Sequence, residues 1–130
     1  MARRLLDCNA LLALGFVQHI HHTRVVAFYA AHSKDKFLTT PITELAFVRV
    51  GVQARYFADI PAAVAAFITL KNASRHKIEM IPDTVGVDAL PAYVQKAADT
   101  TDGHLIALAK AHGARLTTLD TGIPGAELIP

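Results

Sequence analysis

The chain has 130 residues, of which 52% are hydrophobic and 18% charged, and its formal net charge is +2 at pH 7. This length fits one domain with its own core, and so apolar a composition excludes a disordered tail. No apolar run reaches the roughly 18 residues that span a bilayer, and a single cysteine excludes an internal disulfide, so we expect a cytoplasmic protein without membrane association.

Strands and helices are expected to alternate from the start of the chain. Asp7 and Asn9 interrupt the first apolar stretch, which argues against a signal peptide and favours a strand followed by a helix. Periodicity and turn residues in the first half predict strands at 4–7 and 36–39, and helices at 9–19, 24–32, 42–50 and 60–71.

The second half continues this alternation. It is expected to hold a strand at 76–81, a short helix at 85–93 interrupted near Pro91, a helix at 101–112 and a strand at 114–119. Gly113 ends the long helix, as glycine commonly does just past a helix end, and Asp120 begins a turn. Together these elements predict an α/β fold with a mainly parallel sheet, in one domain over residues 1–130.

Four carboxylates lie where the chain is expected to pass from one element to the next: Asp7, Glu44, Asp102 and Asp120. Ligands of such sheets bind beyond the carboxyl ends of the strands, and a strand end and the following helix start often face the same edge. The four acids could therefore converge there and hold one or two Mg²⁺ or Mn²⁺ ions, which prefer oxygen ligands. Each acid alone could instead cap a helix or carry an ordinary surface charge.

Charge is also unevenly distributed along the chain. Residues 1–77 contain ten Lys or Arg and four Asp or Glu, whereas residues 78–130 contain three and seven. A basic half beside an acidic half suits a polyanionic ligand held near a metal-binding pocket, although ordinary surface variation is the commoner cause of such a difference.

Three sequence motifs resemble those of the PIN-domain ribonucleases, in the same order and at similar spacing. They are LLDCNALLAL, PITELAFVRV and TTDGHLIALAKAHGARLTTLD, and the likeness runs from residue 5 to about residue 122. More narrowly, the chain looks like the VapC toxins of bacterial toxin–antitoxin pairs. The resemblance implies a PIN-like domain with about five parallel strands flanked by helices. It also implies a Mg²⁺- or Mn²⁺-dependent endoribonuclease that hydrolyses RNA phosphodiester bonds, forms a homodimer and is inhibited by an antitoxin protein.

The resemblance also assigns site residues. Its catalytic and metal-binding acids fall on Asp7, Glu44, Asp102 and Asp120, and its supporting positions fall on Asn9, Thr118, Arg49 and Asp99. Arg49 is expected to pair with Glu44 or to hold phosphate, and a purely structural salt bridge is an equal alternative. Asp99 is either an outer acid of the site or a helix N-terminal charge. Gly103 stands where the family usually has alanine, and should loosen that helix start.

Two other functions compete with the ribonuclease. One is a PIN-fold binding module without catalysis. The other is a phospho-aspartate receiver switch, which the chain fits poorly because its first strand ends in one acid and Asp83 stands beside Pro82. A cluster of histidines, His19, His21 and His22, lacks further ligands at zinc spacing and is expected to be a solvated turn.

Overall fold

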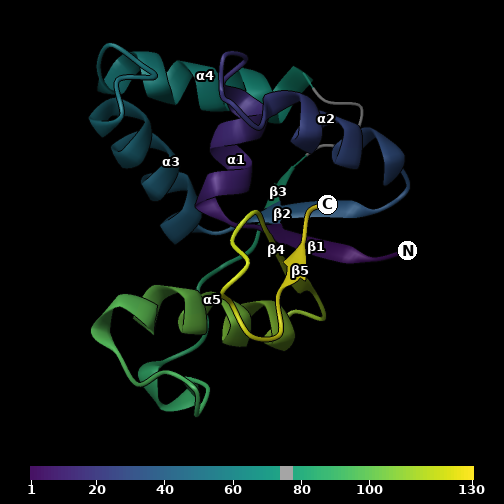
Figure 1. The fold of residues 1–130 in the computed structure, drawn as a ribbon, viewed down its shortest axis with the longest axis vertical. Coiled ribbons are helices and arrows are strands. Elements are labelled where there is room, and N and C mark those ends of the chain that lie inside the picture. The colour runs from purple at the N-terminus through teal and green to yellow at the C-terminus, as the bar shows by residue number, and fades with distance from the viewer. Residues whose placement is uncertain (74–77) are drawn as a thin grey trace.

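A parallel β-sheet forms the centre of the structure, a computed structural model that describes residues 1–73 and 78–130 (Figure 1). Its five strands are β1 (Arg3–Leu6), β2 (Lys36–Thr39), β3 (Glu79–Met80), β4 (Arg115–Thr118) and β5 (Glu127–Leu128). The strand order is β3-β2-β1-β4-β5, and every neighbouring pair is parallel. The predicted α/β fold with a parallel sheet of about five strands is confirmed.

Helices cover both faces of this sheet. They are α1 (Cys8–Gly15), α2 (His22–Ala31), α3 (Pro41–Gln53), α4 (Ile60–Ala73) and α5 (Thr100–Ala111), with single 3-10 turns η1 (Val87–Ala89) and η2 (Ala97–Asp99). Figure 1 shows α1 to α4 on one side of the sheet and α5 on the other. In the described part of the chain, no helix is long and apolar enough to cross a membrane.

The central strand β1 joins two hydrophobic cores because its successive side chains point to opposite faces. Leu6 packs in the cluster built with α1 to α4, which includes Phe47 and Phe67. Leu5 packs in the cluster built with α5, which includes Leu105. Both leucines are at most 1% exposed. A strand buried on both faces is typical of parallel sheets, and it fixes where the ends of β1 and its neighbours lie.

Several predicted boundaries were wrong. The first helix ends at Gly15 rather than near residue 19, and α3 continues to Gln53 instead of stopping near residue 50. Of the helix predicted at 85–93, only the turn η1 forms, and the strand predicted at 76–81 is seen as β3, with residues 76 and 77 outside the described residues. The strand β5 was not predicted.

Candidate active site

Asp7 lies directly after β1, at the carboxyl edge of the sheet between β1 and β4. Its backbone N–H donates to the carbonyl of Thr117 at 3.0 Å, which extends the pairing of the two strands by one residue. The Thr118 hydroxyl donates to Asp7 Oδ2 at 2.9 Å, and the N–H of Cys8 donates to Asp7 Oδ1 at 2.8 Å. Asp7 is only 7% exposed. Its carboxylate is therefore buried and held at both oxygens.

Thr118 is the centre of a small polar network at this edge. Asn9 Nδ2 donates to the Thr118 hydroxyl oxygen at 3.2 Å, and Asn9 Oδ1 accepts from the N–H of Leu119 at 3.2 Å. The N–H of Asp120 also donates to the Thr118 hydroxyl oxygen, at 3.0 Å. The structure thus brings together four of the residues that the sequence singled out, and Thr118 and Asn9 hold the segment that carries Asp120 next to Asp7.

Asp102 lies in the first turn of α5, within range of the charges of the other acids. Burial raises the pKa of Asp7, and the charge of Asp120 raises it further, although hydrogen bonds from Thr118 and Cys8 act against the rise. Burial also raises the pKa of Asp102, as do the charges of Asp7, Asp120 and Asp99. These four aspartates are called the acidic cluster below.

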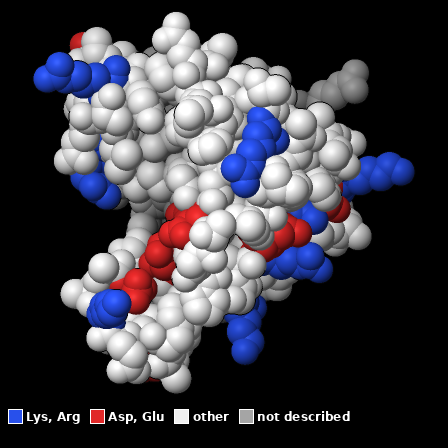
Figure 2. All heavy atoms as spheres, viewed as in Figure 1, with Lys and Arg blue, Asp and Glu red and all other residues white. Residues whose placement is uncertain are grey.

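The acidic cluster lies on an open face of the molecule. Figure 2 shows a band of acidic side chains across the hollow between the helices on one side of the sheet and the α5 region on the other. No ion pair to a basic side chain involves these aspartates in the described residues. Clustered carboxylates without a basic partner, one of them buried, are a donor set that fits a hard divalent cation.

The acids do not yet form a closed coordination shell. Within residues 1–73 and 78–130, no three Asp, Glu, His or Cys side chains lie close enough to share one ion in this conformation. Asp120 is exposed, and its Oδ1 accepts from the N–H of Gly122 at 2.8 Å. Simultaneous binding by the acidic cluster would therefore need its exposed carboxylates to rotate inwards.

Glu44 is not brought into the acidic cluster. It lies in the first turn of α3, where Thr40 caps the helix by accepting from the N–H of Thr43 at 3.1 Å. Glu44 Oε2 accepts from the Thr39 hydroxyl at 2.6 Å and lies 4.0 Å from Lys71 Nζ. The predicted pairing of Glu44 with Arg49 is absent among the described residues, where Lys71 takes that place.

Arg49 instead lies on the exposed side of α3, near the start of α1. Burial and the charge of Asp7 raise the pKa of the Cys8 thiol to about 11, while the charge of Arg49 acts in the opposite direction. The guanidinium is thus close enough to act on the residue next to Asp7. No hydrogen bond or ion pair of Arg49 is seen in the part of the chain that the structure describes, and its phosphate-holding role stays a prediction.

Sequence reasoning missed one polar residue beside the acids. Tyr93 lies in the segment that was expected to be helical, and its hydroxyl oxygen is buried without a hydrogen-bond partner in the described structure. Burial raises the pKa of this phenol, and the charges of Asp102 and Asp99 raise it further. Nothing in the sequence around Tyr93 signals this position, because it depends on how a loop packs against α5.

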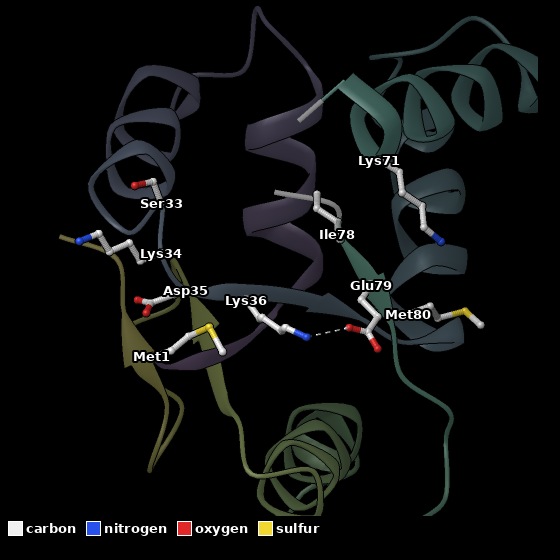
Figure 3. Close-up of a pocket in the computed structure, with 9 residues that line it drawn as sticks. All are labelled: Met1, Ser33, Lys34, Asp35, Lys36, Lys71, Ile78, Glu79 and Met80. Atoms are coloured by element: carbon white, nitrogen blue, oxygen red, sulfur yellow. Dashed lines mark ion pairs between the residues drawn. The ribbon is translucent and has the colours of Figure 1, made fainter. Parts of the chain in front are cut away.

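A cavity of about 700 Å³ lies away from the acidic cluster (Figure 3). Its lining includes Met1 and Lys36, at the amino ends of β1 and β2, and the ion pair of Lys36 Nζ with Glu79 Oε2 at 3.9 Å. Ligands of parallel sheets bind at the carboxyl ends of the strands. We therefore place the candidate active site at the acidic cluster and not in this cavity.

Comparison with known proteins agrees with this geometry. The model of the PIN domain matches residues 4–127, which is nearly the whole chain and includes every member of the acidic cluster. The chain belongs to the PIN-domain family. Among curated PIN-domain relatives, ribonuclease VapC38 of Mycobacterium tuberculosis is 33% identical over 92% of this chain and 86% of its own length. Ribonuclease VapC39 of the same species is 34% identical over 92% of this chain and 89% of its own length.

Solved structures show the same PIN fold. The crystal structure of Mycobacterium tuberculosis VapC20, described as a sarcin–ricin loop cleaving toxin, has a TM-score of 0.71 at 14% identity and covers 98% of this chain and 99% of its own. The structure of DNA-bound VapBC from Salmonella typhimurium has a TM-score of 0.60 at 14% identity, and the match covers 98% of this chain and 97% of that chain. The resemblance inferred from the three motifs is confirmed at the level of family and fold.

Proposed function

We propose that this PIN domain is a Mg²⁺- or Mn²⁺-dependent endoribonuclease and the toxin of a toxin–antitoxin pair. The observation that carries the proposal is the acidic cluster, in which burial and like charges raise the pKa values of Asp7 and Asp102, with no basic side chain among the described residues to offset them. Curated relatives of similar length that carry the name ribonuclease support the same activity.

The proposed ligands of the ion are Asp7, Asp102, Asp120 and Glu44. A divalent ion bound there would neutralise the carboxylates and supply positive charge to a phosphodiester undergoing hydrolysis. Thr118 and Asn9 hold Asp7 and the Asp120 segment in fixed relative positions before any substrate arrives. Glu44 lies in the first turn of α3, which follows β2, so it lies at the same edge of the sheet and would join the set by leaving Thr39 and Lys71.

Basic residues would bring RNA to these acids. Arg49 is exposed on α3, and Lys71 is half-exposed on α4. Both belong to the basic first half of the chain, whose charge would attract the phosphate backbone of RNA. The proposed partners are thus an RNA substrate, a cognate antitoxin protein and a second copy in a homodimer. The proposal of an antitoxin partner rests on the match to the structure of DNA-bound VapBC from Salmonella typhimurium, which shares the fold.

The test compares Asp7→Asn and Asp102→Asn with Asp88→Asn, whose exposed carboxylate lies on η1 outside the acidic cluster. The first two variants are expected to lose RNA cleavage by at least about 100-fold in Mg²⁺ while keeping the wild-type circular dichroism spectrum. Asp88→Asn should cleave like the wild type, and chelation should stop both. Equal cleavage by all three variants would exclude the proposal.

One observation favours a second candidate, a PIN-fold binding module without catalysis. No three potential ligands share an ion in the described conformation, and Glu44 is occupied by Thr39 and Lys71. Calorimetric titration with Mn²⁺ separates the two functions. Saturable Mn²⁺ binding that Asp102→Asn weakens supports the nuclease, whereas no binding by the wild type supports the inert module.

A further inference from the structure

The buried hydroxyl of Tyr93 is unusual because it lacks a hydrogen-bond partner among the described residues. Its oxygen is buried and is the one such side-chain atom in the described residues that has no hydrogen-bond partner. Buried polar groups in folded proteins are nearly always hydrogen-bonded, and an exception calls for a physical explanation. One such explanation is that the hydroxyl donates to an acceptor that comes within reach only in the functional state of the protein.

The packing of the neighbouring residues places Tyr93 next to the start of α5. A Cβ built on Gly103 would lie 2.3 Å from Val94 Cγ2 and 3.4 Å from Pro91 Cδ. Only a glycine therefore lets the segment around Tyr93 lie this close to α5. Gly103 follows Asp102 directly and Val94 follows Tyr93 directly. The packing of Val94 against Gly103 therefore brings the two segments together.

The segment is also held in a defined shape. The N–H of Val94 donates to the carbonyl of Pro91 at 3.1 Å, and Gln95 Nε2 donates to the carbonyl of Ala92 at 2.9 Å. Both bonds span Tyr93, and the first closes a turn over residues 91–94. The orientation of its ring is thus set by packing and local turns, and not by a bond of its own hydroxyl.

The charges that act on this hydroxyl are those of two carboxylates. Besides burial, the charges of Asp102 and then of Asp99 raise the pKa of the Tyr93 phenol. The phenol therefore keeps its proton throughout the neutral range and is a donor. Of the two acids, Asp102 acts more strongly on the phenol, and its own pKa is raised by the other members of the acidic cluster.

We propose that Tyr93 is a positioning residue of the candidate active site, and that its hydroxyl donates a hydrogen bond to the Asp102 carboxylate when that carboxylate turns to bind a divalent ion. The proposal rests on the proposed function in that it takes Asp102 as a ligand. It explains the unpaired hydroxyl, because the bond forms only in the bound arrangement. It also explains Gly103, which admits the segment that carries Tyr93.

The test is Mn²⁺ binding by calorimetry to the full chain, as wild type, Tyr93→Phe and Tyr56→Phe. Tyr56 is a matched control because its ring stacks on Phe16, at 4.5 Å between centroids, and lies outside the acidic cluster. Loss of a partner that orients a metal ligand commonly weakens metal binding by 10–100-fold. We expect about 10-fold weaker Mn²⁺ binding for Tyr93→Phe and no change for Tyr56→Phe.

Two further measurements exclude a merely structural role. Without metal, Tyr93→Phe should melt at the wild-type temperature or higher, because it removes a buried polar atom that has no partner. In the Asp102→Asn background, adding Tyr93→Phe should change the residual Mn²⁺ affinity by less than about twofold, because the acceptor is already altered.

The outcomes distinguish this proposal from the proposed function. Wild-type Mn²⁺ affinity in Tyr93→Phe, in a wild type that binds Mn²⁺ and cleaves RNA, overturns the role of Tyr93 alone. A lower melting temperature of metal-free Tyr93→Phe with unchanged Mn²⁺ affinity does the same. A wild type that binds no Mn²⁺ overturns both proposals, whereas one that binds Mn²⁺ without cleaving RNA overturns only the nuclease.

Discussion

At the scale of single residues, the acidic cluster stores unfavourable electrostatic free energy in the folded protein. Asp7 is buried beside other acids, so its folded-state pKa lies above the ordinary value of 3.8 that it takes in the unfolded chain. The folded state therefore binds a proton more tightly than the unfolded state does. The stability gained from that proton is complete below about pH 3.8 and is lost as pH rises through the folded-state pKa.

The resulting prediction concerns the protein in chelator. The free energy of unfolding, measured with urea between pH 4 and pH 8, should fall with pH more steeply for the wild type than for Asp7→Asn, which cannot titrate there. Saturating Mg²⁺ should reduce the difference, because a bound cation would offset the charge. Parallel pH profiles for the two proteins would contradict the prediction.

Gly103 gives a second residue-scale prediction, and here the structure reverses what the helix propensity suggests. Alanine in a helix is favoured over glycine by up to about 1 kcal/mol, but a methyl group at residue 103 would overlap Val94 Cγ2. Overpacking of this kind costs about 1–3 kcal/mol. Gly103→Ala should therefore lower the free energy of unfolding by about 1 kcal/mol, measured by urea titration.

The double variant Gly103→Ala with Val94→Ala tests the cause. Removing the Val94 methyl groups makes room for the new Cβ, so the double variant should be more stable than the sum of the two single changes predicts, by about 1 kcal/mol. Strict additivity of the two changes would show that the overlap with Val94 is not the reason.

At the scale of secondary-structure elements, the start of α3 depends on two buried hydroxyls. Thr40 accepts from the N–H of Thr43 at 3.1 Å, and the Thr43 hydroxyl accepts from the N–H of Thr40 at 2.9 Å, so each satisfies a backbone donor that the helix leaves unpaired. Both residues are at most 1% exposed, which excludes water as a replacement.

Thr40→Ala should therefore lower the free energy of unfolding by about 1–2 kcal/mol, the upper part of the range for helix caps. Thr40→Ser keeps the hydroxyl and should lose less than half of that. Because Glu44 lies in the same turn, RNA cleavage by Thr40→Ala should also decline. Equal stability of the alanine and serine variants would show that the hydroxyl contributes nothing.

Some of these elements and their neighbours could be predicted from the sequence, and others could not. Asp7, Asn9 and Thr118 were expected at one site because the motif resemblance assigned them to it, and the pairing of β1 with β4 brings their ends together. The strand β5 has only two residues and follows Pro124 and Gly125, so it carries no periodic signal. The helix expected at 85–93 fails beyond its first turn, η1, because Pro91 cannot continue it.

Contacts between distant elements were beyond sequence reasoning. Glu44 pairs with Lys71 because α3 packs on α4, whereas the family resemblance suggested Arg49 as its partner. The segment that carries Tyr93 lies against the start of α5 because Gly103 admits Val94, and the sequence shows only that glycine replaces a commoner alanine. In both cases the decisive quantity is the fit of two surfaces that are separate in the chain.

At the scale of the whole molecule, one buried arginine links the two ends of the chain to the sheet. Arg4 is 5% exposed, and its guanidinium lies over the ring of Phe28 at 5.4 Å from the centroid. It pairs with Asp35, just before β2, and its Nε donates to Glu127 Oε1 in β5 at 2.7 Å. This arrangement fastens the short C-terminal strand to the centre of the sheet.

The pKa of Glu127 makes the contribution of this arrangement to the free energy of unfolding measurable as a function of pH. Burial opposes its charge, but hydrogen bonds from Arg4 and Thr117 and the charges of Arg4 and Arg115 outweigh that effect, so its pKa lies below the ordinary 4.5. The folded state therefore holds the ionised form more strongly than the unfolded state does. That stability is present above about pH 4.5 and is lost as pH falls through the folded-state pKa.

Glu127→Gln should consequently be less stable than the wild type at pH 7, by at least about 1 kcal/mol, because it leaves the buried Arg4 with only Asp35. The difference should shrink as pH is lowered from 5 to 3, where the wild type itself loses the carboxylate. Glu79→Gln is the matched control, since its ion pair with Lys36 spans 3.9 Å between half-exposed side chains and should contribute little. Urea unfolding at pH 7, 5 and 3 measures all three proteins, and a constant difference between wild type and Glu127→Gln would show that β5 is fastened by packing alone.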